Sequence, residues 1–164
     1  MKKKAKNISI KGIKLSKKEK LLLSKEKPWG LILFKRNIKS FYQVKNLVSD
    51  IKKLSKNQKF PILIDEEGLS VSRLRNIFNH KFDASYFGNL YKIDQKVAQV
   101  LYKKYLLSLC KNLKKIGINI NTIPVLDVLR KNTNKIIGKR SFSNNEKIVK
   151  KLGEITIRQC HSYN

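Results

Sequence analysis

Residues 61–68 read PILIDEEG, a continuous apolar run that ends in three consecutive carboxylates. A short apolar run of this kind is typical of a strand buried on both faces, as in a parallel sheet covered by helices. A similar run, LILF, lies before it at residues 31–34, and a longer apolar stretch lies after it at residues 118–128. We predict a strand at each of the three positions.

Helical patterns separate these strands. Their expected starts are capping residues: Ser16 with Glu19, Ser40 with Gln43, Asp94, and Ser143 with Glu146. The second signal opens a helix whose apolar residues between 41 and 54 share one face. The third opens a long helix that Gly117 terminates, and the fourth opens the last helix of the chain. Residues 1–7 are expected to be a Lys-rich tail, followed by a short extended stretch at residues 8–13.

Strands that alternate with helices must return by crossovers, which gives a parallel sheet in an α/β fold. An open doubly wound sheet usually carries a Gly-rich phosphate-binding turn, and the sequence has no G-x-G-x-x-G or Walker pattern. We therefore favour a TIM (β/α)8 barrel. A complete barrel takes about 250 residues, so the 164 residues provide about half of one.

The chain is strongly basic, with 38 Lys and Arg residues against 11 Asp and Glu residues and a net charge of +27. Its 41% apolar content excludes wholesale disorder and is typical of a globular unit. Such a charge is often a sign of nucleic-acid binding. Here Lys is scattered through every segment, and we interpret most of the excess as solvated surface.

The sequence shows no secretory leader and no apolar run long enough to cross a membrane. The two cysteines, Cys110 and Cys160, fall in helical patterns without metal-ligand spacing or a disulfide framework. We therefore expect a cytoplasmic protein with no membrane partner.

Polar residues follow each predicted strand: Arg36 and Asn37, then residues 65–67, then Asp127. In parallel barrels this end of the sheet carries the chemistry, although a single such carboxylate more often caps a helix or solvates a loop. Three strands with the same feature favour a site. Carboxylates opposite Arg side chains suit a polyhydroxylated ligand such as a sugar. The obvious extension, Asp65, Glu66 or Asp127 as the acid and nucleophile of a glycosidase, is not adopted here.

Four sequence motifs argue against this catalytic assignment. In chain order they are GLILFKRNI at 30–38, PILIDEEG at 61–68 with Val71 and Arg73, PVLDV at 124–128, and IGKRSFS at 137–143. Together they resemble the N-terminal half of a bacterial β-N-acetylhexosaminidase of glycoside hydrolase family three. The resemblance implies the N-terminal half of one TIM-barrel domain over residues 1–164. It also implies removal of terminal β-linked N-acetylglucosamine from cell-wall muropeptides, by a retaining two-step route without a cofactor.

The resemblance makes Asp65, Arg73 and Arg140 substrate-binding residues and gives the chain no catalytic residue and no metal ligand. The family's Lys-His-x-Pro-Gly-His-Gly loop and its later Asp nucleophile have no match among the 164 residues. We therefore expect this chain to be inactive by itself. His161 is predicted in the last helix and His80 in a loop, and neither is expected to be catalytic.

The sequence departs from the family at Leu69 and Ser70, where a second Gly and an Arg are usual, and this is expected to reshape the loop if that Gly has positive φ. Half a barrel also leaves two open sheet edges, which predicts self-association. Two other functions remain open. One is a basic nucleic-acid-binding module, although no RNP, KH or zinc-finger pattern supports it and no specific nucleic-acid partner is expected. The other is a non-catalytic interaction module.

Overall fold

The computed structural model describes residues 4–79 and 81–163. The chain divides into two compact units. The ranges of unit 1 are Met1–Asp65, Arg73–Asn79 and Asn112–Asn121. The ranges of unit 2 are Glu66–Ser72, His80–Lys111 and Thr122–Asn164. The single barrel domain expected over residues 1–164 stays a prediction.

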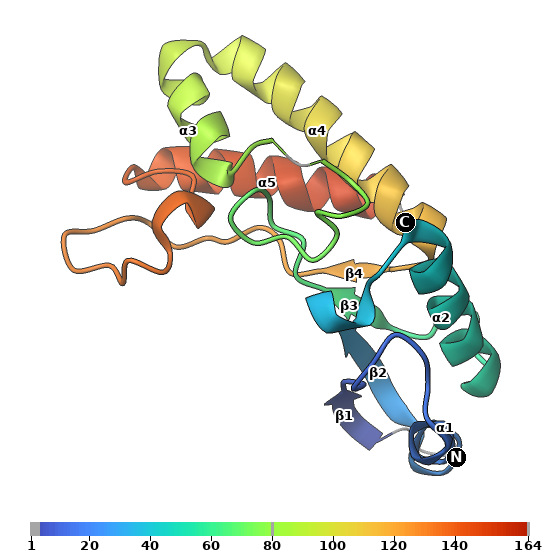
Figure 1. The fold of residues 1–164 in the computed structure, drawn as a ribbon. Coiled ribbons are helices and arrows are strands. Elements are labelled where there is room, and N and C mark those ends of the chain that lie inside the picture. Colours follow the sequence, from blue (N-terminus) through green and yellow to red (C-terminus); the bar gives the residue numbers. More distant parts are fainter. Residues whose placement is uncertain (1–3, 80, 164) are drawn as a thin grey trace. The chain divides into compact units, whose positions relative to one another are not determined.

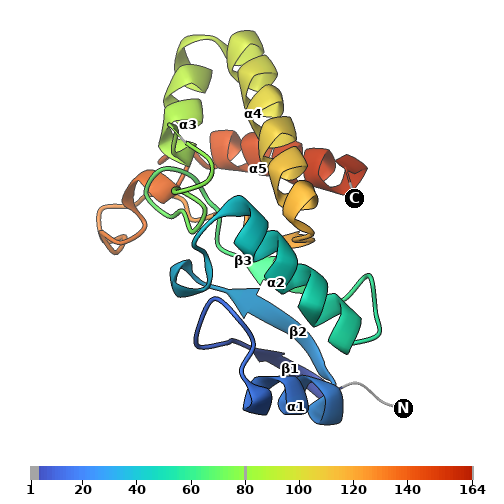
Figure 2. The same ribbon diagram turned by 45° about the vertical axis from the view of Figure 1, so that its right-hand side comes forward.

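Within the described residues, unit 1 contains a parallel sheet of four strands in the order β1-β2-β3-β4, as Figure 1 shows; Figure 2 gives a second view of β1, β2 and β3. The strands are β1 (Lys4–Ile8), β2 (Pro28–Leu33), β3 (Ile62–Ile64) and β4 (Ile120–Asn121). Ile64 lies opposite Leu33 on one side and opposite Asn121 on the other. Parallel neighbours that follow one another in sequence require crossovers. The predicted parallel α/β sheet is confirmed.

Burial explains the apolar runs of β2 and β3. Leu31, Leu33, Ile62 and Ile64 are fully buried. Two helices belong to the same unit, α1 (Lys17–Glu26) and α2 (Phe41–Leu54), and they contact each other. The buried face of α2 consists of Val44, Leu47, Val48 and Ile51. The predicted helix at residues 41–54 is therefore confirmed.

The N-terminal segment differs from the prediction. Strand β1 occupies most of the segment expected to be a tail, and residues 9–13 lie outside any strand. An edge strand tolerates Lys side chains because one of its edges faces solvent. Pairing with β2 is close, since a Cβ on Gly30 would lie 2.9 Å from Asn7 Oδ1. Gly30 thus leaves room for the side chain of its register partner Asn7, and the apolar pattern of β1 does not reveal the strand.

The strand predicted at residues 118–128 is also shorter than expected, because β4 covers only Ile120–Asn121. Pro124 has no backbone N–H for a sheet hydrogen bond, which limits any continuation. Just before β4, the side chain of Asn119 forms hydrogen bonds with the backbone of the neighbouring β3 segment. Its Oδ1 accepts a hydrogen bond from Ile62 N–H at 2.7 Å, and its Nδ2 donates to the Phe60 carbonyl at 3.1 Å.

Unit 2 is mainly helical. Its elements are α3 (Ala84–Ile93), most of α4 (Gln95–Ile116), the 3-10 helix η2 (Gly138–Arg140) and α5 (Glu146–Tyr163). Its core combines aromatic and aliphatic side chains of α3, α4, α5 and the segment before α5. The buried members are Phe87, Tyr102, Leu106, Phe142, Ile148, Val149, Leu152 and Ile155.

Helix α3 is absent from the sequence prediction, and Gly88 in its middle is one reason, because Gly weakens helix propensity. The structure shows why a glycine stands there. A Cβ at residue 88 would lie 1.7 Å from the Phe142 carbonyl oxygen. The packing of α3 on the segment before α5 therefore requires a residue without a side chain.

The expected helix starts are largely confirmed. Ser16 and Glu19 form a complete capping box. Ser40 Oγ accepts a hydrogen bond from Gln43 N–H, whereas the Gln43 side chain accepts from Lys39 N–H and so does not complete the box.

The ends of α4 agree with the prediction, and the start of α5 differs from it. Asp94 Oδ1 accepts from the backbone N–H of Val97, and Gly117 ends α4 with φ +95°. The last helix begins at Glu146, so the capping role falls on Asn145, whose Oδ1 accepts from Lys147 N–H. Ser143 Oγ instead accepts from Asn145 N–H.

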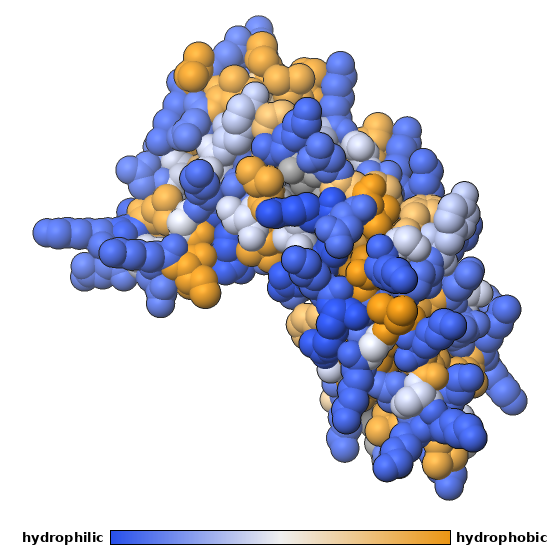
Figure 3. Space-filling view, viewed as in Figure 1, coloured by the Kyte–Doolittle hydropathy of each residue, from blue (hydrophilic) through white to orange (hydrophobic). Residues whose placement is uncertain are grey.

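The surface agrees with a scattered Lys excess. Hydrophilic side chains cover most of the face shown in Figure 3, with smaller apolar patches between them. Among the helices of residues 4–79 and 81–163, none combines the length and the apolar character needed to cross a membrane.

We predict that Gly88→Ala destabilises the protein, because the added methyl group would collide with the Phe142 carbonyl. Overpacking of this kind costs roughly 1–3 kcal/mol. For a chain of this size this lowers Tm by roughly 2–12 °C in thermal denaturation followed by circular dichroism. The matched control is Gly12→Ala, where a Cβ meets no atom within 4 Å. Equal Tm values for the two variants would contradict the packing role of Gly88.

Candidate functional site

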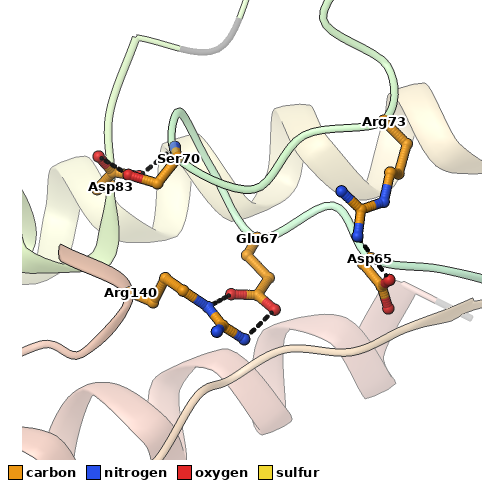
Figure 4. A network of polar contacts seen from close by, with 6 residues as sticks. All are labelled: Asp65, Glu67, Ser70, Arg73, Asp83 and Arg140. Atoms are coloured by element: carbon orange, nitrogen blue, oxygen red, sulfur yellow. Dashed lines mark hydrogen bonds and ion pairs between the residues drawn. The ribbon is translucent and has the colours of Figure 1, made fainter. Parts of the chain in front are cut away.

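Asp65 and Arg73 form an ion pair within unit 1. Asp65 directly follows β3, and Arg73 Nη2 donates to Asp65 Oδ2 at 2.9 Å, as Figure 4 shows. The two side chains are 22% and 28% exposed. Partial burial strengthens such a pair relative to a fully solvated one. The structure therefore brings together two of the three predicted substrate-binding residues.

The third predicted residue, Arg140, pairs with Glu67 within unit 2. Arg140 Nε donates to Glu67 Oε2 at 2.7 Å, and Arg140 Nη2 donates to Glu67 Oε1 at 2.9 Å. This two-point contact, drawn in Figure 4, fixes the plane of the guanidinium as well as its position. Glu67 is only 9% exposed, and Arg140 is the positive charge that offsets the burial of its carboxylate.

The segment around Arg140 is held by its neighbours in sequence. Arg140 ends η2, whose backbone turn includes a hydrogen bond from Arg140 N–H to the Ile137 carbonyl. The next residue, Ser141, is fully buried, and its Oγ donates to the Asp127 carbonyl. Phe142 then enters the core of unit 2. The IGKRSF motif thus positions Arg140 through the buried Ser and Phe that follow it.

The loop that follows Glu67 is held by Ser70. Its backbone N–H donates to Asp83 Oδ1 at 2.7 Å, and its hydroxyl donates to Asp83 Oδ2 at 2.9 Å (Figure 4). Gly68 has φ +151°, and a Cβ there would lie 2.6 Å from the Phe82 carbonyl oxygen. The described non-glycine residues with positive φ are Lys27 and Lys56, so Leu69 adopts an ordinary conformation. The loop accommodates both departures from the family pattern without strain at Leu69.

A small cavity in unit 2 lies beside the Glu67–Arg140 pair. Its volume is about 20 Å³, enough for one water molecule. Its lining combines the two charged groups with aromatic rings and an aliphatic segment: Glu67, Ala84, Phe87, Tyr102, Tyr105, Leu106, Ile123, Pro124, Val125, Arg140 and Phe142. A polar group beside aromatic faces is the usual surrounding of a small polar ligand.

Two tyrosines of this cavity have strongly perturbed acidity. Burial raises the pKa of Tyr102, against the opposing effect of its hydrogen bond with Thr156 Oγ1 at 2.7 Å. Burial also raises the pKa of Tyr105, and the negative charges of Glu66 and Asp83 add to this effect. Both phenols therefore stay protonated across the neutral pH range.

Other polar residues after the strands have structural roles. Asn37 is fully buried, accepts from Phe34 N–H and donates to the Ile10 and Gly12 carbonyls. Arg36 Nε donates to the same Ile10 carbonyl. These two residues hold the segment after β1, so the polar end of β2 organises a loop.

His161 lies exposed on α5, as predicted, and His80 lies outside the described residues. Within residues 4–79 and 81–163, no cluster of three or more His, Cys, Asp or Glu side chains is arranged to hold a metal ion. Sequence reasoning missed Glu67 as the partner of Arg140, and Asp83 as the partner of Ser70. The acidic run at residues 65–67 was the only available signal for the first of these.

Comparisons with known proteins agree with these motifs. The model of the glycosyl hydrolase family 3 N-terminal domain matches residues 1–163. A beta-hexosaminidase from Xanthomonas campestris pv. campestris (strain B100) is 28% identical over 155 residues, which cover 94% of this chain and 46% of the relative. A beta-hexosaminidase from Xanthomonas axonopodis pv. citri (strain 306) is 30% identical over 156 residues, 94% of this chain and 45% of that protein.

Solved structures show the same relationship. NagZ from Neisseria gonorrhoeae, in a complex with zinc ion, superposes with a TM-score of 0.86 and 27% identity over 98% of this chain and 48% of that one. NagZ in complex with N-trifluoroacetyl-D-glucosamine gives the same TM-score with 26% identity. The chain thus spans about half the length of the relatives it matches. The predicted fold, the N-terminal half of a barrel-type α/β domain, is confirmed.

We predict that the free energy of unfolding falls as pH rises above about 10. An unfolded tyrosine ionises near pH 10, whereas Tyr102 and Tyr105 stay protonated to higher pH in the folded state. Each contributes a loss of about 1.4 kcal/mol per pH unit until its own folded pKa is reached. Urea denaturation at several pH values between about 9 and 11 measures how the free energy of unfolding changes with pH.

The control for this slope is Tyr105→Phe, which removes one titrating group from the cavity. The variant should lose stability less steeply with pH than the wild type. If the two proteins lost stability equally steeply with pH, the pKa of Tyr105 would be the same in the folded and unfolded chain, which would contradict its burial.

Proposed function

The chain belongs to the glycosyl hydrolase family 3 N-terminal domain family, and we propose that it forms the sugar-binding part of a β-N-acetylhexosaminidase. The observation that supports this most directly is the set of oriented Arg side chains at the family motifs. Arg73 is held by Asp65, and Arg140 is held by both oxygens of Glu67. The curated relatives are beta-hexosaminidases.

The proposed ligand is a terminal β-linked N-acetylglucosamine. Its hydroxyls suit the carboxylate of Asp65, which accepts hydrogen bonds, and its carbonyl and ring oxygens suit the guanidinium groups of Arg73 and Arg140, which donate them. A solved relative carries N-trifluoroacetyl-D-glucosamine, a derivative of the same sugar. The wider proposal is that the sugar comes from cell-wall muropeptides in the cytoplasm.

The proposed reaction of the family, a retaining hydrolysis in two steps, needs an acid/base group and a nucleophile. The Lys-His-x-Pro-Gly-His-Gly sequence that would supply the acid/base His does not occur in the 164 residues. We therefore assign binding to this chain and no catalytic residue. The 164-residue polypeptide is proposed to be inactive by itself.

We also propose that the isolated polypeptide associates with itself through its sheet edges. In the part of the chain that the structure describes, β1 pairs only with β2, and β4 pairs only with β3. The outer backbone groups of an edge strand are a template for pairing with a strand of another chain.

Binding is tested by titrating N-acetylglucosamine into the purified chain and following chemical shifts by NMR. Asp65→Ala removes a charged acceptor, and Arg140→Ala removes a charged donor. A hydrogen bond to a charged group contributes about 1.5–3 kcal/mol. We therefore expect Kd to rise about 10- to 100-fold in either variant.

The matched control is Arg130→Ala. Arg130 also pairs with a carboxylate, that of Glu146, at 3.5 Å, but both side chains are mostly exposed. This variant should bind the sugar as the wild type does. Absence of sugar binding by the wild-type chain, or equal losses in all three variants, would contradict the assignment. Light scattering of the same samples measures self-association.

Catalysis is tested with an aryl β-N-acetylglucosaminide. We expect the 164-residue chain to release no aryl alcohol above a buffer control, because the family loop that would supply the acid/base His does not occur in its sequence. Turnover that disappears in Asp65→Ala would show that this chain is active by itself, and would overturn the proposed division between binding and chemistry.

A further inference from the structure

Unit 2 contains a pair of thiols that the sugar site does not use. Cys110 lies on α4, Cys160 lies on α5, and their Sγ atoms are 3.7 Å apart. Both thiols are free and only partly buried. They are therefore close to each other, and neither residue is fully buried.

The helices that carry them are packed together at a buried contact. Tyr102 on α4 and Thr156 on α5 share a hydrogen bond of 2.7 Å between hydroxyls. Cys160 follows Thr156 by four residues, and Cys110 follows Tyr102 by eight, so each thiol shares a helix face with one partner of that bond. In Figures 1 and 2, α5 crosses α4, and the hydrogen bond between Tyr102 and Thr156 shows that the two helices touch. The proximity of the thiols thus follows from core packing.

The pair is also prepared chemically for oxidation. The pKa of Cys110 lies below that of an ordinary thiol, because its hydrogen-bonding contact with Cys160 favours the thiolate of Cys110. The same contact raises the pKa of Cys160, and burial adds to that effect. A thiolate is the reacting form in disulfide exchange.

We propose that Cys110 and Cys160 form a reversible disulfide that links α4 to α5 when a low-molecular-weight disulfide such as oxidised glutathione is present. The Cys110 thiolate attacks one glutathione sulfur and releases the first glutathione as a thiolate. The Cys160 sulfur loses its proton, attacks Cys110 Sγ and releases the second. The protein loses two electrons and two protons, and one glutathione disulfide becomes two molecules of glutathione.

The crosslink has a structural consequence. The sulfurs move from 3.7 Å to the bonding distance of about 2.0 Å, and the bond closes a loop of about 50 residues. A loop of this length restricts the unfolded chain strongly, so the oxidised form should resist unfolding more than the reduced form. The Tm of the oxidised chain is expected to rise by roughly 5–15 °C.

The test incubates the full chain with oxidised glutathione under non-denaturing conditions, followed by intact-mass analysis, a free-thiol assay and thermal denaturation. The expected product has lost two hydrogen atoms, has no free thiol, migrates as a monomer on a non-reducing gel, and returns to the initial Tm after reduction. Cys110→Ser and Cys160→Ser are the matched controls. Each should end as a glutathione adduct without a gain in Tm.

Three outcomes would overturn the proposal. The first is a wild-type chain that retains two glutathione adducts, and the second is a wild-type chain that forms only intermolecular crosslinks. The third is an intramolecular disulfide that leaves Tm unchanged or lower, which would mean that closing the bond distorts the helix packing. None of these results depends on sugar binding, so the test is independent of the proposed function.

Discussion

The parallel pairing of β3 with β2 on one side and with β4 on the other fixes where the acidic run at residues 65–67 lies in the fold. β3 has three residues, and its two ends, Ile62 and Ile64, are fully buried. A slip of one residue would exchange Ile64 for Asp65 at a buried position, at the cost of an unsolvated carboxylate. The register is therefore strongly specified, and Asp65 is the first residue outside the strand.

Burial distinguishes the carboxylate–arginine pairs near the family motifs from an ordinary surface pair. Arg130 and Glu146 are both mostly exposed, so their contact gains little energy and imposes little order. The Glu67–Arg140 pair is far more buried and uses two donor atoms of the guanidinium. A side chain held in this way loses little further entropy when a ligand binds, which is the benefit of preorganisation.

Much of the fold was predictable, because each buried strand is a short apolar run and most helices start at a capping residue. The sequence could not show α3, whose central Gly88 is explained only by contact with Phe142. It also could not show how short β4 is, since the Asn119 side chain adds its own hydrogen bonds to the backbone bond from Asn119 N–H to the Ile62 carbonyl. For the site, the motifs predicted Asp65, Arg73 and Arg140. The pairing of Arg140 with Glu67 depends on two loops distant in sequence, which local patterns do not encode.

The departures at Leu69 and Ser70 show how the loop after β3 keeps its conformation while its chemistry changes. The turn needs a glycine at residue 68, where φ is +151°, and the chain retains it. Ser70 then holds the loop through two hydrogen bonds to Asp83. The resemblance implies an Arg at the position of Ser70, and on that reading the loop offers one guanidinium fewer to an anionic or carbonyl oxygen. The proposed recognition of the sugar then assigns more weight to Arg73 and Arg140, each of which is oriented by a carboxylate of its own unit.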